Sequence, residues 1–192
     1  MRLALWCILM LVVSCNGDYL PKPKAYLRLQ YPKATYENKQ FAEVPLTFDV
    51  SDQVGRITIK SIPSSTKSYG INLNYDSLKA TLFLTYKAVK HNAENLNAFL
   101  NDAQKLTLEH TKKADEIPVY PFVDSTRKVY GILSEVKGNA ASPAQFYVTD
   151  SVSHFLTGSL YFEAKPNYDS ILPAAKYLQN DIKVLMETLS WK

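Results

Sequence analysis

Alternating hydrophobic and polar residues predict seven β-strands in this chain. The clearest alternation covers residues 155–164, where Leu156, Gly158 and Leu160 share one face and the residues between them share the other. Weaker alternation predicts the remaining six strands over residues 46–50, 56–60, 71–75, 80–86, 128–136 and 144–149. Because short links join the last three strands of the chain, we expect those strands to pair as an antiparallel meander.

Two stretches instead repeat hydrophobic residues every three or four positions, which predicts amphipathic helices. We expect the first helix over residues 93–115, with Asn92 as its N-cap and with Pro118 preventing its extension. The second helix should begin within residues 166–170, and Trp191 should fasten its end. The stripe that this helix should lay on the sheet consists of Ile171, Ala174, Ala175, Leu178, Ile182, Leu185, Met186 and Leu189.

The order strands, helix, strands, helix predicts an α+β domain, in which two amphipathic helices cover a mostly antiparallel sheet. This order resembles that of the Mog1/PsbP-type α/β/α sandwich. We assign residues 46–192 to this single domain, which is long enough for a core of its own. Residues 15–45 hold four prolines and form an approach segment. This segment is either an extended arm packed on the domain or a basic, aromatic strip lying on anionic lipid headgroups.

The chain begins with the features of a bacterial export signal. Arg2 precedes an apolar run over residues 3–13, which is shorter than the roughly 20 residues of a transmembrane helix. Ser14 and Cys15 then follow in the arrangement of bacterial lipoproteins, in which the cysteine thiol accepts a diacylglyceryl group. We therefore assign residues 1–14 to a lipoprotein signal peptide and Cys15 to lipidation. The alternative is an ordinary secretory signal with an incidental cysteine.

Composition and charge argue against redox chemistry and against nucleic-acid binding. The chain has two cysteines, and because Cys7 leaves with the signal and Cys15 is acylated, no thiol remains for a disulfide or for redox chemistry. The formal charge of +4 is scattered, without the basic stripe that nucleic acid requires. The 46% hydrophobic content is that of a globular protein, and thirteen tyrosines supply side chains suited to contact surfaces.

Catalytic and metal-binding patterns are weak in this sequence. His91, His110 and His154 are far apart, and none has a second ligand four residues further along a helix. No glycine-rich nucleotide-binding motif occurs either, so we expect no metal, no cofactor and no enzyme activity. Aspartate–serine pairs fall at predicted turns or helix starts, where local backbone hydrogen bonds explain them: residues 76–77, 124–125, 150–151 and 169–170.

The loop over residues 137–143 is the candidate binding site, because its small side chains let a partner approach the backbone closely. Polar side chains in and beside the loop, together with tyrosines of the adjoining strands, would supply the contacts. These candidate binding residues are Tyr130, Lys137, Asn139, Gln145, Tyr147 and Tyr161. The alternative is a plain connection between strands whose tyrosines lie in the core.

Five segments carry a family resemblance: PKPKAYLR at 21–28, HTKKAD at 110–115, VYGIL at 129–133, KGNAASPAQF at 137–146 and ETLSW at 187–191. On these segments the chain resembles the gliding motility-associated lipoproteins GldD. The resemblance implies a lipoprotein that is needed for surface gliding and linked to type IX secretion, with no assigned reaction and no catalytic residue. Lipoproteins sent to the surface of such bacteria often carry an acidic cluster after the cysteine. Because only Asp18 is acidic here, we expect a domain that faces the periplasm.

Two hypotheses for the function follow from these observations. The first is a non-catalytic component of the gliding and secretion machinery, held in the cell envelope by its lipid and binding other envelope proteins. The second is a periplasmic hydrolase or a small-ligand-binding lipoprotein that uses His110 or His154. Tethering favours the first, because it raises the effective concentration of the domain for partners at the same membrane.

Cys15→Ala should release the protein from the membrane fraction, because the substitution removes the thiol that carries the lipid. The domain should still fold, since Cys15 precedes it. Membrane fractionation and incorporation of labelled palmitate measure both effects, and Cys7→Ala is the control, because residue 7 leaves with the signal. A Cys15→Ala protein that stays in the membrane and still incorporates fatty acid would contradict the assignment.

Overall fold

The computed structural model describes residues 30–164 and 167–192. The predicted signal peptide, Cys15 and the first part of the approach segment lie outside these residues. Within them, none of the helices has the length and apolar character needed to cross a membrane. The described part of the approach segment packs on the domain: the ring of Tyr31 stacks on that of Tyr177 at a centroid distance of 4.8 Å. This contact agrees with the extended-arm interpretation for that part.

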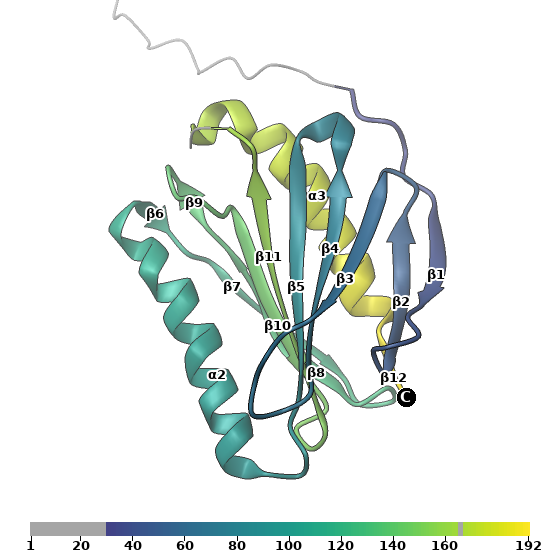
Figure 1. The fold of residues 1–192 in the computed structure, drawn as a ribbon. Helices are drawn as coiled ribbons and strands as arrows, with labels where there is room; N and C mark the ends of the chain where they lie inside the picture. Colours follow the sequence, from purple (N-terminus) through teal and green to yellow (C-terminus); the bar gives the residue numbers. More distant parts are fainter. Residues whose placement is uncertain (1–29, 165–166) are drawn as a thin grey trace, which may run out of the picture.

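A seven-stranded antiparallel sheet forms the centre of the fold, which confirms the predicted α+β class (Figure 1). Its spatial order is β3-β4-β5-β11-β10-β8-β7, so the predicted meander of β8, β10 and β11 is present. The strands are β3 (Arg56–Ser61), β4 (Ser68–Tyr75), β5 (Ala80–Ala88), β7 (Val119–Asp124), β8 (Val129–Glu135), β10 (Ala144–Thr149) and β11 (His154–Phe162).

A smaller sheet holds the remaining predicted strand. It consists of β1 (Tyr36–Gln40), β2 (Leu46–Ser51) and β12 (Ser190–Trp191), with β2 in the middle. The prediction contained neither β1 nor β12. β1 lies within the approach segment, on the N-terminal side of the domain boundary predicted at residue 46. β12 has only two residues, and its pairing with β2 links the C-terminus to the start of the domain.

Strand β7 was also missing from the prediction, which used the prolines at 118 and 121 only to end the first helix. Pro121 lies inside the strand, opposite Ile132 of β8. β7 is the last strand of the sheet, so it pairs on one side only. A proline without an N–H group is tolerated at such an edge.

The first helix is shorter than predicted. Helix α2 covers Ala93–Leu108 and is followed by the 3₁₀ turn η2 (Glu109–Lys112), whereas the prediction extended the helix to residue 115. The chain then forms the short strand β6 (Ala114–Glu116), which pairs with β9 (Lys137–Gly138). This pairing uses backbone groups that a longer helix would need. The predicted N-cap is confirmed, because Asn92 Oδ1 accepts the N–H groups of residues 94 and 95.

The two helices cover opposite faces of the sheet. Helix α3 (Tyr168–Thr188) lies behind β4 and β5 in Figure 1, and its buried stripe joins the large core cluster with Leu156 and Leu160 of β11. Helix α2 lies on the other face, where Phe99 packs on Phe155 of the same strand. The stripe predicted for the second helix is thus confirmed; its fully buried members are Ala175, Leu178, Ile182, Leu185 and Met186.

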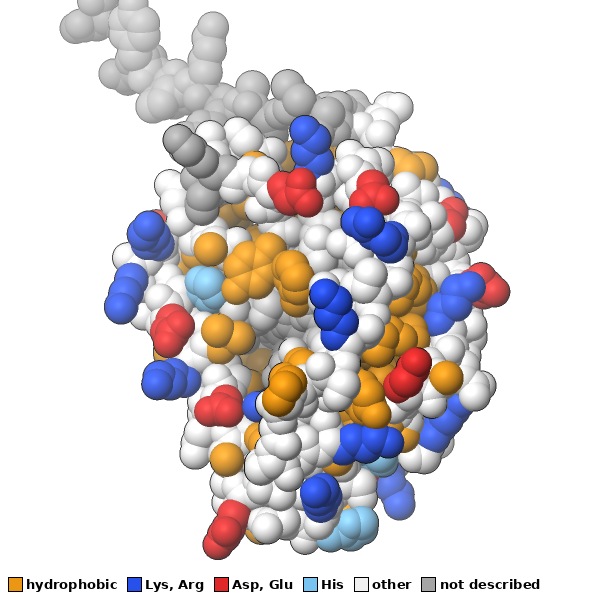
Figure 2. Space-filling view, viewed as in Figure 1, with side chains coloured by type: hydrophobic (Ala, Val, Ile, Leu, Met, Phe, Trp, Pro, Cys, Tyr) orange, Lys and Arg blue, Asp and Glu red, His pale blue; other side chains and the backbone are white. Residues whose placement is uncertain are grey.

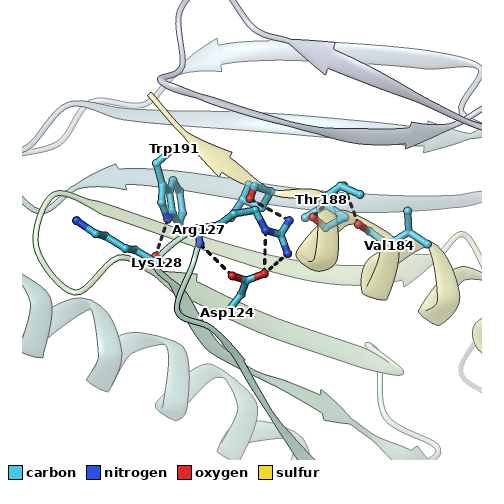
Figure 3. Close-up of polar contacts among 8 residues, drawn as sticks. Asp124, Arg127, Lys128, Val184, Thr188 and Trp191 are labelled. Carbon is cyan, nitrogen blue, oxygen red and sulfur yellow. Dashed lines mark hydrogen bonds and ion pairs between the residues drawn. The ribbon is translucent and has the colours of Figure 1, made fainter.

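Residues at the β7–β8 turn bind the C-terminal end of the chain (Figure 3). This confirms the prediction that Trp191 fastens the end of the second helix. Trp191 Nε1 donates to the carbonyl oxygen of Lys128 at 3.1 Å, and its indole stacks on the His154 ring at a centroid distance of 5.2 Å. The Arg127 guanidinium donates to Asp124 at 2.6 Å and to the carbonyl oxygen of Leu189 at 3.4 Å. These bonds hold the chain directly after α3.

One carboxyl group is buried where α3 meets the smaller sheet. Asp181 is only 5% exposed, and its Oδ1 accepts a hydrogen bond from the Tyr36 hydroxyl at 2.7 Å. Burial raises the pKa of the Asp181 carboxyl, although the hydrogen bond from Tyr36 opposes the shift. Burial, together with the bond to Asp181, raises the pKa of Tyr36 to about 12. The carboxylate form of Asp181 is therefore disfavoured in the folded state.

This raised pKa gives Asp181 a defined effect on stability. The folded protein binds more protons than the unfolded chain between the two pKa values of Asp181, so the residue's contribution is lost as pH rises through that window. Asp181→Asn removes the titration. The free energy of unfolding of the variant should therefore exceed that of the wild type increasingly from pH 4 to pH 8, by on the order of 1 kcal/mol.

Denaturant unfolding across that pH range measures the difference. Asp102→Asn removes a carboxylate at an exposed position of α2 and serves as the control. A difference between wild type and Asp181→Asn that does not change with pH, or that shrinks as pH rises, would contradict the assignment.

Candidate functional site

Only the N-terminal half of α2 packs closely on the sheet. Phe99 is the one fully buried residue of the helix, and its ring lies 5.7 Å from that of Phe155. Toward its C-terminal end the helix exposes hydrophobic side chains: Leu106 is 40% and Leu108 is 63% exposed. The helix and the sheet therefore enclose a wedge-shaped space beneath the second half of α2.

This space is a cleft of about 240 Å³ between α2 and strands β7, β8, β10 and β11. Figure 2 shows a hollow beside α2 that is flanked by hydrophobic side chains. We call Leu106, Leu108 and Val119 the cleft rim, because all three line the cleft and are at least 40% exposed. Every described residue that lines the cleft is uncharged. The cleft is thus suited to apolar and neutral polar groups.

A row of polar side chains forms the floor. Gln145 of β10 pairs with Ser134 of β8 on one side and with Ser159 of β11 on the other, so the three side chains lie across neighbouring strands on one face. All three are buried and line the cleft. Neither serine hydroxyl forms a hydrogen bond with another of the described residues, whereas the Gln145 amide bonds both Thr107 and His110. The floor therefore offers two hydroxyls to whatever occupies the cleft.

Gln145 connects the floor to the end of α2. Its Oε1 accepts a hydrogen bond from Thr107 at 2.8 Å, and its Nε2 lies 2.8 Å from His110 Nε2. Because the amide nitrogen can only donate, the His110 nitrogen accepts, which requires a neutral ring with its proton on Nδ1. Burial lowers the pKa of His110, although the charge of Glu109 opposes the shift, and the lowered pKa favours this neutral form.

The comparison with known families bears on this arrangement. The family model described as gliding motility lipoprotein GldD matches residues 16–191, which include every element around the cleft. The chain belongs to this family. Membership makes it a membrane-anchored lipoprotein of the cell envelope with a role in gliding motility. No curated protein and no solved structure matches the chain, so the narrower likeness to the Mog1/PsbP sandwich remains a prediction.

Four of the six candidate binding residues of this gliding motility lipoprotein lie on the face that α2 covers. Gln145 and Tyr147 line the cleft, and the Tyr147 ring stacks on Phe155 at 5.7 Å. Tyr161 lies on the same face and packs edge-on against Phe83 at 5.8 Å. Tyr130 lies on β8, two residues before Ile132, and therefore on the same face. It does not line the cleft.

Lys137 and Asn139 have structural partners instead and lie outside the cleft. Lys137 forms an ion pair with Glu116 across the β6–β9 pair. Asn139 Oδ1 accepts the backbone N–H of Tyr168 at 2.9 Å, at the first residue of α3. Gly138 between them has a φ of +106°, a conformation that favours glycine. The residues of the predicted binding loop therefore do not line the cleft, although the loop is followed in the chain by the strand that carries Gln145.

The sequence-based search missed the rim and the two serines of the floor. Leu108 lies off the apolar stripe used to predict α2, and Val119 belongs to the strand that was not predicted. A signal for the serine in β11 was present: Thr157, Ser159 and Tyr161 form the polar face of the strand with the clearest alternation. A polar strand face beneath an amphipathic helix indicates an incompletely filled interface.

The histidines and the aspartate–serine pairs occupy separate places. His154 Nδ1 lies 2.9 Å from the Tyr86 hydroxyl, on the α3 side of the sheet, while His91 Nε2 lies 3.4 Å from Ser153 in a turn. Among residues 30–164 and 167–192, no three histidine, cysteine, aspartate or glutamate side chains form a group that could hold a metal. Asp150 illustrates the predicted local role of the pairs, because its Oδ1 accepts three consecutive backbone N–H groups.

Proposed function

We propose that this lipoprotein acts without catalysis, by binding other envelope proteins of the gliding and type IX secretion machinery from a periplasmic position. Family membership supports the setting. The observation that carries the proposal is the grouping of exposed apolar side chains around an uncharged cleft. Single exposed hydrophobic residues are common on soluble domains, whereas a group of them beside a hollow is typical of an interaction site.

The cleft rim provides contact area from two different elements. Leu106 and Leu108 come from α2, while Val119 comes from the edge strand β7. Val123 lies four residues further along β7 on the same face and is 68% exposed. A partner that covers these side chains removes apolar surface from water, which favours association by roughly 25 cal/mol per Å² of apolar area.

The lipid anchor supports a binding role as well. A lipid on Cys15 confines the domain to a thin layer at the membrane, where the predicted partners also lie. Confinement raises the effective concentration of each partner, so a modest contact area at the rim suffices for a stable complex. Lipidation at Cys15 and the binding site at the rim thus fulfil complementary roles.

Leu108→Lys should weaken the complex with gliding or secretion components about tenfold or more, because it places a charge where a partner would bury a leucine. Lysine suits the C-terminal end of a helix, so folding should be preserved. The readouts are the spreading of colonies and quantitative co-purification of named gliding and secretion proteins from cross-linked envelopes. Val152→Lys is the control, because Val152 is a 46% exposed hydrophobic residue in a turn outside the cleft. Equal spreading and equal co-purification for both variants would refute a binding site at the rim.

A periplasmic hydrolase is the second candidate, favoured by the position of His110 next to the cleft residue Gln145. His110→Gln and His154→Gln separate the two functions, because glutamine retains an acceptor for the neighbouring side chain but cannot transfer protons at neutral pH. A non-catalytic protein should support gliding at wild-type rates with either variant, once cellular protein amounts are matched. Loss of gliding by one variant that remains folded, membrane-bound and able to co-purify the partner would favour the hydrolase.

A further inference from the structure

We propose that the cleft receives one uncharged aromatic side chain of the partner protein, a tyrosine or tryptophan whose polar group reaches the serines of the floor. This inference rests on the proposed function and adds the chemistry of the contact. Four features of the cleft support it: its size, the absence of charge in its described lining, the unpartnered hydroxyls of Ser134 and Ser159, and the rim around its mouth.

The size of the cleft fits a ring rather than a small aliphatic group. Its volume is about 240 Å³. Apolar cavities of about 150 Å³ in other proteins bind benzene. The cleft therefore has room for a phenol or an indole, and Tyr147 provides an aromatic wall against which such a ring can pack.

The lining excludes a charged group. No charged residue lines the cleft among those the structure describes, so an entering carboxylate, ammonium or guanidinium would be desolvated without an opposite charge. Among the residues that the structure describes, the one ionisable group bonded to the floor is His110, whose ring is neutral in its bond with Gln145. A partner side chain that enters this space is accordingly neutral.

The floor also requires a polar group on the entering ring. Ser134 is 6% and Ser159 is 9% exposed, and their hydroxyls lie on either side of a Gln145 amide that already bonds Thr107 and His110. A purely apolar occupant would close the cleft and leave both hydroxyls buried without a partner, which is unfavourable. A phenol hydroxyl or an indole N–H satisfies at least one of them.

The rim favours a protein over a free small molecule as the carrier of the ring. A molecule that fills only the cleft would leave the outer surfaces of Leu108 and Val119 in water. A partner chain that inserts one side chain necessarily lies across the mouth and covers these residues. A central aromatic anchor in a pocket, surrounded by a rim that excludes water, is the usual arrangement of a binding hot spot.

The first test uses the purified lipid-free domain and small probes. By NMR of the isotope-labelled domain, p-cresol and indole should bind and shift the signals of Gln145 and Tyr147, whereas the cationic benzamidine should not. Ser159→Leu fills the cleft and should abolish p-cresol binding. The conservative pair Ser134→Ala and Ser159→Ala should weaken p-cresol binding roughly three- to tenfold while sparing toluene, which has the same ring without the hydroxyl. Absence of p-cresol binding, or equal effects on p-cresol and toluene, would overturn the inference.

The second test identifies the occupant in native envelopes. A photo-cross-linking amino acid at Leu106 should attach to a partner peptide containing tyrosine or tryptophan, and replacing that residue with alanine should cost at least tenfold in affinity. Cross-linking to a peptide without an aromatic residue would overturn the inference.

The variants separate this inference from the proposed function. If Leu108→Lys loses the partner while Ser159→Leu retains it, the rim binds a protein but the cleft holds no anchor, so the inference fails alone. If p-cresol binds in the cleft while Ser159→Leu still retains the partner, the cleft is a small-molecule site and the inference again fails. If Leu108→Lys retains the partner, the proposed binding surface itself is wrong.

Discussion

The alternation of side chains along β11 is the constraint on which the rest of the structure depends. β11 is the central strand of the seven, so both of its faces must be covered. One face carries Leu156 and Leu160, which are completely buried beneath α3. The other face carries Thr157 and Ser159, which cannot attract a helix by hydrophobic burial. The difference between the two faces determines how tightly each helix packs.

The consequences for α2 follow directly. The helix is held at one end by Phe99 on Phe155 and at the other by the bonds of Thr107 and His110 to Gln145. Between these two attachments the sheet presents the polar side chains of Thr157, Ser134 and Ser159, and the neighbouring Ile132 and Tyr147 do not fill the space beneath the helix, so the cleft stays open. Hydrogen bonds fix a distance between the elements that they join, whereas hydrophobic contacts reward closer approach. The cleft thus results from replacing packing with a polar bridge.

Much of this could be predicted from the sequence. All seven predicted strands exist, the meander pairs as expected, and α3 has the expected apolar stripe. Local patterns determine these features. The short pairs β6–β9 and β12–β2 could not be predicted in the same way, because they depend on pairing with residues far along the chain. The edge strand β7 was missed for another reason, since it pairs locally with β8 across a short turn.

The candidate site residues show the same difference between what local patterns determine and what tertiary contacts determine. Gln145, Tyr147 and Tyr161 could be found because they stand on predicted strands, and strand periodicity places them on one face. Lys137 and Asn139 were selected for their position in a loop of small residues, but their partners, Glu116 and the start of α3, are invisible without the tertiary fold. The cleft itself could not be predicted, since it depends on how far α2 stands from the sheet.

The protonation state of His110 connects this geometry to binding. The imidazole must be neutral to accept from Gln145, and burial lowers its pKa, so the bridge is intact at neutral pH. With the bridge intact, the end of α2 has a fixed position and the cleft exists before any partner arrives. A preformed cleft spares the ordering of side chains that an induced site would require, and this saving increases affinity without additional contact area. The polar bridge that prevents α2 from packing would therefore also prepare the cleft for the partner that we propose.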